Sequence, residues 1–121
     1  MNRIAIVGPG AIGSLFGALL ARAGNELFLL DDNESRAAQR STRGIRVVDG
    51  ESEWVVPVTS STDAADFGIA DTVIVCTKAY QTESAIRAMT SLVGDTTILV
   101  SLPPGMGNVE QLAALAPGRC V

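Results

Sequence analysis

Three glycines near the N-terminus have the spacing of a turn that binds phosphate. Residues 8–13 read Gly8-Pro9-Gly10-Ala11-Ile12-Gly13, which is the pattern G-x-G-x-x-G. In such a turn the first glycine permits a tight bend, the second lets a pyrophosphate approach the backbone, and the third lets the next helix pack closely on its strand. The free N–H groups at the start of that helix favour an anion. Because the motif alone is weak, a glycine turn without a ligand is the alternative.

Two acidic residues follow the turn at the distance expected for an acid that binds a ribose. Asp31 lies 23 residues after Gly8, and this spacing is about 20 in dinucleotide-binding folds. A carboxylate there would accept hydrogen bonds from the adenosine ribose and repel a 2′-phosphate, and Asp32 would double the repulsion. The pair therefore favours NAD(H) over NADP(H). Two alternatives stay open: Arg36 and Arg40 could still reach a 2′-phosphate, and the aspartates, Asp32 above all, could be solvated turn residues.

Lys78 is the only lysine of the chain. It follows a β-branched apolar segment, and open α/β sheets bind their ligands at the carboxyl ends of strands. There an ammonium group can donate to a carbonyl or carboxylate oxygen; the alternative is a surface lysine at the start of a helix. The loop Pro103-Pro104-Gly105-Met106-Gly107 also follows a predicted strand, so it could form the floor under a nicotinamide or serve only as a stiff connector.

The spacing of apolar residues predicts the elements that position these candidates. Continuous apolar segments predict buried strands over residues 4–7, 27–30, 72–77 and 97–102. Helices are predicted after the glycine turn and over 33–43, 80–93 and 108–115, whereas 64–70 is ambiguous and 120–121 could start another strand. Residues 45–48 and 54–58, joined across Asp49-Gly50, predict a hairpin. Strands that alternate with helices predict an α/β fold, a Rossmann-like doubly wound parallel sheet with helices on both faces.

The first strand and helix carry no charged residue between positions 4 and 21. A signal peptide or a membrane span must therefore be considered, but Gly8-Pro9-Gly10 would break a spanning helix after only a short apolar segment. After this break the apolar residues follow the i, i+3, i+4 spacing of a helix, at Ile12, Leu15, Phe16, Leu19 and Leu20. They predict the apolar face of an amphipathic helix, with Gly24 as its C-cap.

Composition excludes several kinds of chemistry. With no histidine among 121 residues, the chain has no Ser-His-Asp triad, no Cys-His pair and no histidine-bound metal, and we expect no metal site. A net charge of −4 argues against nucleic acid as a partner. Cys76 and Cys120 are too few for a disulfide scaffold. We expect them to be small buried apolar side chains in a reducing compartment, the cytoplasm.

From Arg3 to Val121, the chain resembles the N-terminal, cofactor-binding domain of the ketopantoate reductase (2-dehydropantoate 2-reductase) family. The resemblance rests on the glycine turn, on Cys76-Thr77-Lys78-Ala79-Tyr80-Gln81, and on Gly105-Met106-Gly107-Asn108 with Glu110 and Leu112. It implies an oxidoreductase of pantothenate biosynthesis that passes hydride from a nicotinamide to a small 2-keto acid, giving a 2-hydroxy acid. It also implies that residues 8–13, Thr77 and Gly105 contact the cofactor and that Lys78 is a catalytic lysine near cofactor and substrate.

The chain departs from the family pattern in three places. Family members usually end the second strand with an arginine that takes the NADP phosphate, whereas Asp32 stands here, as in the NAD-using branch of the D-mandelate dehydrogenase type. The family loop Gln-Asn-Gly is replaced by Pro103-Pro104-Gly105, which implies altered substrate use or lost activity. The helical domain that supplies the main catalytic lysine is absent. We therefore expect residues 1–121 to be an N-terminal fragment that is inactive alone.

Two other functions stay open. A non-catalytic NAD-sensing module, such as those that regulate potassium transport, would also be short and carry G-x-G-x-x-G with an acid after the second strand. The segment Lys78-Ala79-Tyr80-Gln81 argues against it. A Rossmann-like domain that has lost its ligand is disfavoured by the three glycines and Asp31. No membrane partner is expected, and a homodimer of the full-length protein is compatible with the resemblance.

Overall fold

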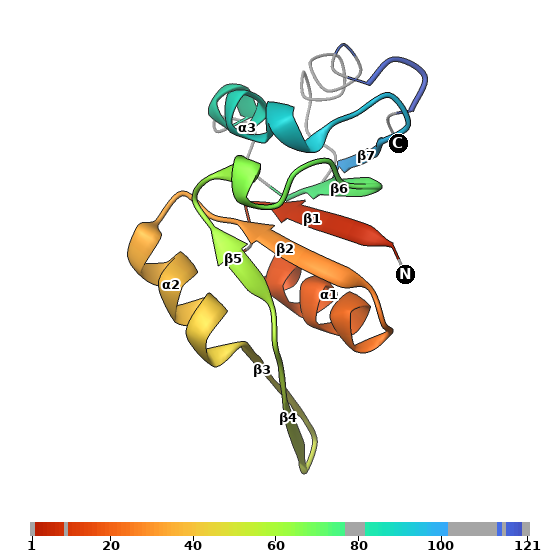
Figure 1. Cartoon of the computed structure of the whole chain (residues 1–121). Coiled ribbons are helices and arrows are strands. Elements are labelled where there is room, and N and C mark those ends of the chain that lie inside the picture. The colour runs from red at the N-terminus through yellow and green to blue at the C-terminus, as the bar shows by residue number, and fades with distance from the viewer. Residues whose placement is uncertain (1, 9, 77–81, 102–113, 115, 120–121) are drawn as a thin grey trace.

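The computed structural model describes residues 2–8, 10–76, 82–101, 114 and 116–119 of the chain. Within these ranges strands and helices alternate (Figure 1). The strands are β1 (Arg3–Val7), β2 (Glu26–Leu30), β3 (Ile45–Asp49), β4 (Ser52–Val56), β5 (Thr59–Ser61), β6 (Thr72–Val75) and β7 (Ile98–Ser101). The α-helices are α1 (Ala11–Arg22), α2 (Glu34–Arg43) and α3 (Thr82–Met89), and two 3-10 turns are η1 (Ala64–Asp66) and η3 (Thr90–Leu92).

Five strands form one parallel sheet in the order β5-β2-β1-β6-β7. Its central strand, β1, aligns Val7 with Leu30 of β2 on one side and with Val75 of β6 on the other. Because the paired strands run in the same direction, their carboxyl ends meet at one edge of the sheet. The predicted Rossmann-like parallel sheet is confirmed.

Helices cover both faces of the sheet, with α1 and α2 on one face and α3 on the other (Figure 1). Under α3, Phe28, Val73 and Leu99 from three strands are fully buried in one cluster with Met89. Phe67 stacks on Phe28 with the ring centroids 5.0 Å apart. Under α1, the aliphatic side chains of β1 and β2 form a second cluster. This two-sided burial is what a parallel sheet requires.

The face of α1 that meets the sheet is mainly small residues, which corrects most of the sequence prediction; of the predicted apolar face, Leu20 packs against the cluster under α1. Gly13, Gly17 and Ala18 are buried. The predicted apolar face is instead largely open, with exposed fractions of 49% for Leu15, 43% for Phe16 and 47% for Leu19. The spacing of the apolar residues predicted the helix correctly. It did not predict the buried face, because the helix lies so close to the strands that small side chains fit there best. In the described ranges no helix, α1 included, is long and apolar enough to cross a membrane.

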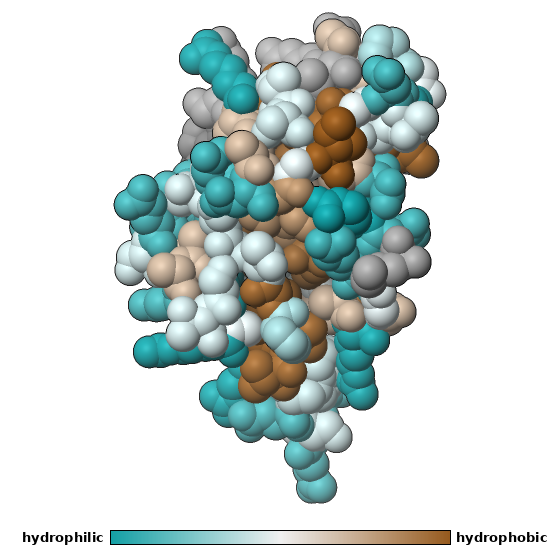
Figure 2. Space-filling view, in the orientation of Figure 1, coloured by the Kyte–Doolittle hydropathy of each residue, from teal (hydrophilic) through white to brown (hydrophobic). Residues whose placement is uncertain are grey.

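The predicted hairpin is confirmed as β3 and β4, which pair antiparallel and project from the body of the molecule (Figure 1). Its inner face carries Val47 and Val56, which are buried in a cluster with Ala18 of α1. The guanidinium carbon of Arg22 lies 4.2 Å from the centre of the Trp54 ring and joins α1 to the hairpin a second time. Figure 2 shows hydrophilic side chains at the hairpin tip and along both flanks of this face, with apolar atoms in a narrow strip between them.

β5 is the strand that the sequence did not predict. Its residues, Thr59–Ser61, are polar and show no apolar pattern, yet they pair in parallel with the end of β2. The helix predicted over 80–93 occurs as α3 followed by η3, and the ambiguous segment 64–70 contains η1. The strand predicted over 72–77 ends earlier, at Val75, and the strand predicted over 97–102 occurs as β7, with position 102 outside the described residues. The helix predicted over 108–115 and the strand at 120–121 fall outside the described residues, apart from position 114.

Candidate functional site

Three segments lie side by side at the carboxyl edge of the sheet. The Gly8 amide donates to the Leu30 carbonyl oxygen at 3.1 Å, which joins the glycine turn to the end of β2. The Cys76 amide donates to the Val7 carbonyl oxygen at 2.8 Å, which joins the end of β6 to the same turn. The start of the glycine motif, the acidic segment after β2 and the segment after β6 are therefore brought to the edge where open α/β sheets bind ligands.

The glycine turn leads directly into the start of α1. Gly8 has a φ of 74°, a conformation that glycine adopts at little cost. Gly10 is the N-cap of α1 and, being glycine, provides no side-chain cap to the helix. A Cβ at Gly10 would meet nothing within 4 Å among the described residues, so none of them fills the space beside this backbone. Such a helix start fits the pyrophosphate of a dinucleotide, whose oxygens need N–H donors.

Gly13 lies on the first turns of α1 beside the end of β6. A Cβ there would lie 3.4 Å from both Cys76 Sγ and Ile6 Cγ2. The tighter position is Gly17, which sequence reasoning missed: its Cβ would lie 2.9 Å from a side-chain atom of β2. The Ser14 hydroxyl is buried and has no hydrogen-bond partner among the described residues. Burial raises the pKa of the Cys76 thiol.

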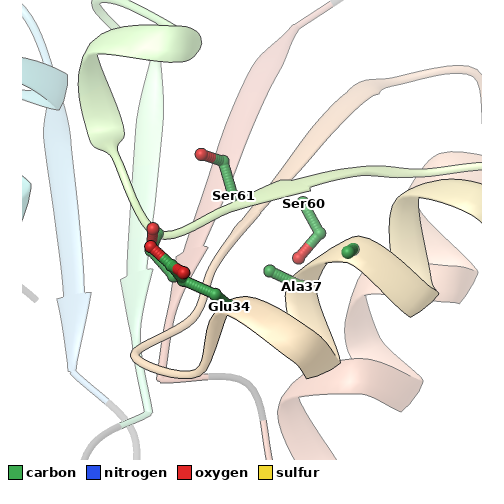
Figure 3. Close-up of a pocket in the computed structure, with 6 residues that line it drawn as sticks. Glu34, Ala37, Ser60 and Ser61 are labelled. Carbon is green, nitrogen blue, oxygen red and sulfur yellow. The ribbon is translucent and has the colours of Figure 1, made fainter.

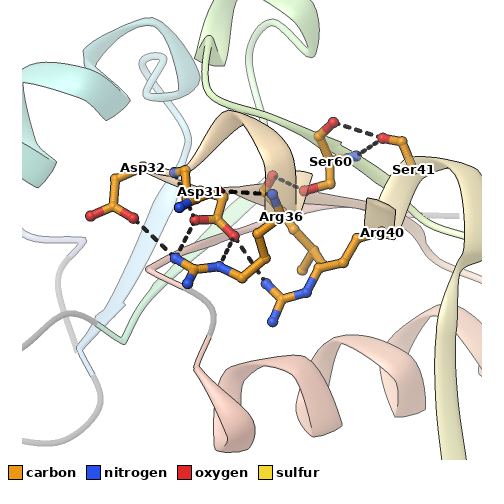
Figure 4. Close-up of polar contacts among 8 residues, drawn as sticks. Asp31, Asp32, Arg36, Arg40, Ser41 and Ser60 are labelled. Carbon is orange, nitrogen blue, oxygen red and sulfur yellow. Dashed lines mark hydrogen bonds and ion pairs between the residues drawn. The ribbon is translucent and has the colours of Figure 1, made fainter. Parts of the chain in front are cut away.

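The Asp31 carboxylate is enclosed by two arginines of α2 (Figure 4). Its Oδ1 accepts from Arg36 Nη2 at 2.6 Å and from the Asn33 amide at 3.0 Å. Its Oδ2 accepts from Arg36 Nε at 2.7 Å and from Arg40 Nη1 at 3.2 Å. The side chain of Asp31 is 1% exposed. That of Asp32, whose Oδ1 lies 3.1 Å from Arg36 Nη2, is 82% exposed. Of two adjacent aspartates, one is thus a buried ion-pair partner and the other faces solvent.

The ion pairs decide the charge state of this cluster. Burial raises the pKa of the Asp31 carboxyl, but the hydrogen bonds from Arg36 and the Asn33 amide, together with the charges of Arg36 and Arg40, outweigh it. The net pKa of Asp31 lies below its usual value, so the carboxylate is ionised at neutral pH. The hydrogen bond with Asp31 raises the pKa of Arg36. Four charges, two of each sign, therefore stand at the end of β2.

Hydrogen bonds near both ends of α2 hold this helix, and with it Arg36 and Arg40, beside Asp31. The Asn33 side chain caps the helix by accepting from the Arg36 amide at 2.9 Å. Arg40 follows Arg36 by four residues, so both lie on one helix face. Towards the far end, Ser41 Oγ donates to the Ser60 carbonyl oxygen at 2.7 Å and accepts from the Ser60 amide at 2.8 Å (Figure 4). Sequence reasoning missed this link between α2 and β5, because two serines 19 positions apart form no local pattern.

A shallow pocket of about 240 Å³ lies between α2 and the end of β5 (Figure 3). It is lined by Glu34, Ala37, Ala38, Ser60, Ser61 and Thr62. The hydroxyl groups of its two serines are already bonded within the protein, to the Leu29 carbonyl oxygen and to Asp66. The pocket stands on the β5 side of β2, whereas the glycine turn stands on the β1 side. One of its lining residues, Ser61, accepts from the Asp31 amide at 3.0 Å, so the pocket adjoins the acidic segment after β2 and not the glycine turn.

Several expected site residues lie outside the described residues: Pro9, Thr77, Lys78 and Gly105, with the rest of the loop at 103–107. The backbone of Ala11 and Ile12 forms the first turn of α1. Within the described ranges, no group of three or more histidine, cysteine, aspartate or glutamate residues could hold a metal ion.

The chain is similar in sequence to a known family. The model of the family described as "Ketopantoate reductase PanE/ApbA" matches residues 4–121. The 2-dehydropantoate 2-reductase of Halobacterium salinarum is 35% identical over 121 residues, which cover 98% of this chain and 39% of that protein. The chain thus spans well under half the length of this curated relative.

Solved structures of known proteins are similar in fold to this chain. A PanE/ApbA family ketopantoate reductase from Ralstonia eutropha JMP134 has a TM-score of 0.84 and 31% identity, covering 97% of this chain and 39% of that one. A D-mandelate dehydrogenase, solved with NADH and anilino(oxo)acetate, has a TM-score of 0.86 and 28% identity, covering 97% of this chain and 38% of that one. These comparisons give no support to a regulatory module of potassium transport.

Proposed function

This chain belongs to the ketopantoate reductase PanE/ApbA family, and we propose that it is the nicotinamide-dinucleotide-binding part of a reductase that converts a small 2-keto acid into a 2-hydroxy acid. The observation that carries the proposal is the glycine turn at the carboxyl edge of the sheet. Gly8 bends the chain there, and Gly10 gives the start of α1 no side-chain cap, with no described residue filling the space beside it.

We propose that each part of the site binds a different group of the cofactor or the substrate. Residues 8–13 bind the pyrophosphate through the backbone, the acidic segment after β2 binds the adenosine ribose, and Thr77 and Gly105 contact the nicotinamide half. The bound nicotinamide supplies the hydride. Lys78 donates a hydrogen bond to the keto acid and stabilises the negative charge that develops on its carbonyl oxygen. Lys78 follows Cys76 by two residues in the sequence, and the Cys76 amide bonds the Val7 carbonyl oxygen next to the glycine turn, which supports this role.

We also propose that the chain prefers NAD(H) to NADP(H). Asp31 and Asp32 bring two negative charges to the end of β2, where a 2′-phosphate would have to sit. A related D-mandelate dehydrogenase was solved with NADH. The charges of Arg36 and Arg40 are matched by these carboxylates, so the segment offers no net positive charge to a phosphate.

The activity itself is proposed for the whole protein, because the curated relative is more than twice as long as this chain. Residues 1–121 are expected to bind the cofactor and to turn over almost nothing by themselves. A cytoplasmic location and a homodimer of the whole protein are further proposals; the first is supported by the biosynthetic activity for which its relatives are named. Gel filtration of the whole protein tests the second.

Titration calorimetry of the 121-residue chain with NADH and with NADPH tests the proposal. We expect NADH to bind with a dissociation constant in the micromolar range and NADPH to bind more weakly. Absence of binding of either dinucleotide at millimolar concentration would contradict it. The whole protein, assayed for NADH oxidation with a panel of 2-keto acids that includes ketopantoate, then tests the reaction and its substrate.

A further inference from the structure

We infer that Asp31 sets the choice of cofactor indirectly, by holding Arg36 and Arg40 and neutralising them, while Asp32 is the carboxylate that meets the adenosine ribose. This inference rests on the proposed function. It changes the role expected for Asp31, which the sequence motif alone would make the direct partner of the ribose. Asp31 becomes a positioning residue that acts through the two arginines.

The first reason is that the Asp31 carboxylate has no acceptor site left. Its two oxygens receive four N–H donors, two on each oxygen, at distances from 2.6 to 3.2 Å. An ionised carboxylate offers about four acceptor positions. Its side chain is also 1% exposed, so a ribose hydroxyl would have to displace an arginine to reach it. In Figure 4 the carboxylate is turned towards the guanidinium groups of α2.

The second reason is the exposure of the neighbouring carboxylate. The Asp32 side chain is 82% exposed, and Arg36 Nη2 holds its Oδ1 at 3.1 Å. The Leu30 carbonyl oxygen, two residues earlier, bonds the Gly8 amide, so this segment borders the pyrophosphate turn. Asp32 therefore has free acceptor capacity at the place where a dinucleotide carries its adenosine ribose.

The third reason is competition for Arg36. A 2′-phosphate carries nearly two negative charges and binds tightly to guanidinium groups. To take the Nε–Nη2 edge of Arg36 in a bidentate pair, it would have to break two bonds to Asp31, at 2.6 and 2.7 Å, and leave a buried carboxylate with less compensation. The Asp31 side chain is 1% exposed, and a buried carboxylate that loses a hydrogen-bonded cation is costly. The pairing with Asp31 therefore disfavours NADPH, although two arginines stand close by.

The test is a comparison of Asp31→Asn with Asp32→Asn, each titrated with NADH and NADPH by calorimetry. In D31N the arginines lose their buried counter-ion, so we expect NADPH affinity to rise at least tenfold and NADH affinity to change less than threefold. In D32N we expect NADH affinity to fall at least fivefold. A direct ribose contact by Asp31 gives the reverse, a large loss of NADH binding in D31N and little change in D32N, and overturns the inference.

The double variant D31N/R36Q shows whether Asp31 acts through Arg36. We expect it to lose the gain in NADPH affinity that D31N produces; a gain that persists without Arg36 overturns the inference. A thermal melt shows whether D31N folds. If it does not, the NADH titration of D32N is the deciding measurement, and an unchanged NADH affinity overturns the assignment of the ribose to Asp32. If the unmodified chain binds neither dinucleotide, the proposed function itself fails, which is a different outcome from any of these.

Discussion

The Gly8 amide lies 3.1 Å from the Leu30 carbonyl oxygen and donates a hydrogen bond to it. This bond joins the glycine turn after β1 to the acidic segment after β2. A dinucleotide needs both segments at once, because its pyrophosphate and its adenosine ribose are neighbouring groups of one molecule. Parallel pairing of β1 and β2, in the register Val7↔Leu30, places the two segments together.

Replacing Gly10 with alanine is expected to weaken NADH binding at least tenfold while the fold persists. The added methyl group would lie beside the helix start, where the pyrophosphate meets the backbone, and it would touch none of the described atoms within 4 Å. The loss of glycine at the N-cap costs up to about 1 kcal/mol. Calorimetric titration and a thermal melt of the same sample check both parts. Unchanged NADH affinity would contradict the role of Gly10.

Replacing Gly17 with alanine is expected to act on stability. The new Cβ would lie 2.9 Å from Leu27 Cδ2 and 3.1 Å from Ile6 Cδ1, so buried side chains of both strands must shift. Overpacking costs roughly 1–3 kcal/mol, and the better helix propensity of alanine returns about 1 kcal/mol. We expect a net loss of about 1 kcal/mol in urea unfolding, and a larger loss for Gly17→Val. A G17A chain more stable than the original would show that α1 can move away from the sheet.

The ion pairs of Asp31 predict a pH dependence of stability. The pKa of Asp31 is lower in the folded chain than in the unfolded one, so its contribution is present above about pH 4 and is lost as the pH falls through the folded pKa. At pH 7 we expect D31N to lower the free energy of unfolding by roughly 2 kcal/mol. Urea titrations from pH 7 to pH 3 should show this difference shrinking below about pH 4. A difference that stays constant over the whole range would contradict the assignment.

The exposed neighbour provides the matched control for that experiment. Asp32 is 82% exposed and makes one surface ion pair with Arg36. Such pairs contribute about 0–1 kcal/mol. D32N should therefore change the free energy of unfolding by less than about 1 kcal/mol, whereas its effect on NADH binding should be the larger one.

Cys76 is expected to react slowly with thiol reagents. Burial against α1 raises the pKa of its thiol, and the thiolate is the reactive form. At pH 8, iodoacetamide should modify the peptide that contains Cys76 at least tenfold more slowly in the folded chain than in urea, as followed by mass spectrometry. Equal rates in both states would mean that the end of β6 is not packed against Gly13.

Local patterns in the sequence account for much of this fold. The apolar segments at β1, β2, β6 and β7 predict strands because a parallel sheet buries both of its faces. The glycine spacing predicts the turn because its conformation depends on residues close in the chain, as the φ of 74° at Gly8 illustrates. The antiparallel hairpin follows from Gly50 for the same local reason, although its two-residue turn is Gly50-Glu51 and not Asp49-Gly50, because Asp49 pairs with Ser52 at the end of β3.

What the sequence did not reveal depends on tertiary contacts. The polar strand β5 exists because it pairs with β2, and Ser60 is bonded to a serine of α2. Large apolar residues of α1 such as Phe16 are exposed, because the sheet contacts the glycines of that helix. Asp31 was placed correctly at the end of β2, but its enclosure by Arg36 and Arg40 could be seen only once α2 was packed beside it.

Amide chemical-shift mapping of the ¹⁵N-labelled chain during titration with NADH tests the central claim most directly. The account predicts that the amide signals of Gly8, Gly10, Gly13 and Asp32 shift in a saturable way, while those of the hairpin β3–β4 stay in place. Absence of shifts at millimolar NADH would contradict it. So would shifts confined to Ser60, Thr62 and the rest of the pocket between α2 and β5, because they would place the dinucleotide away from the glycine turn.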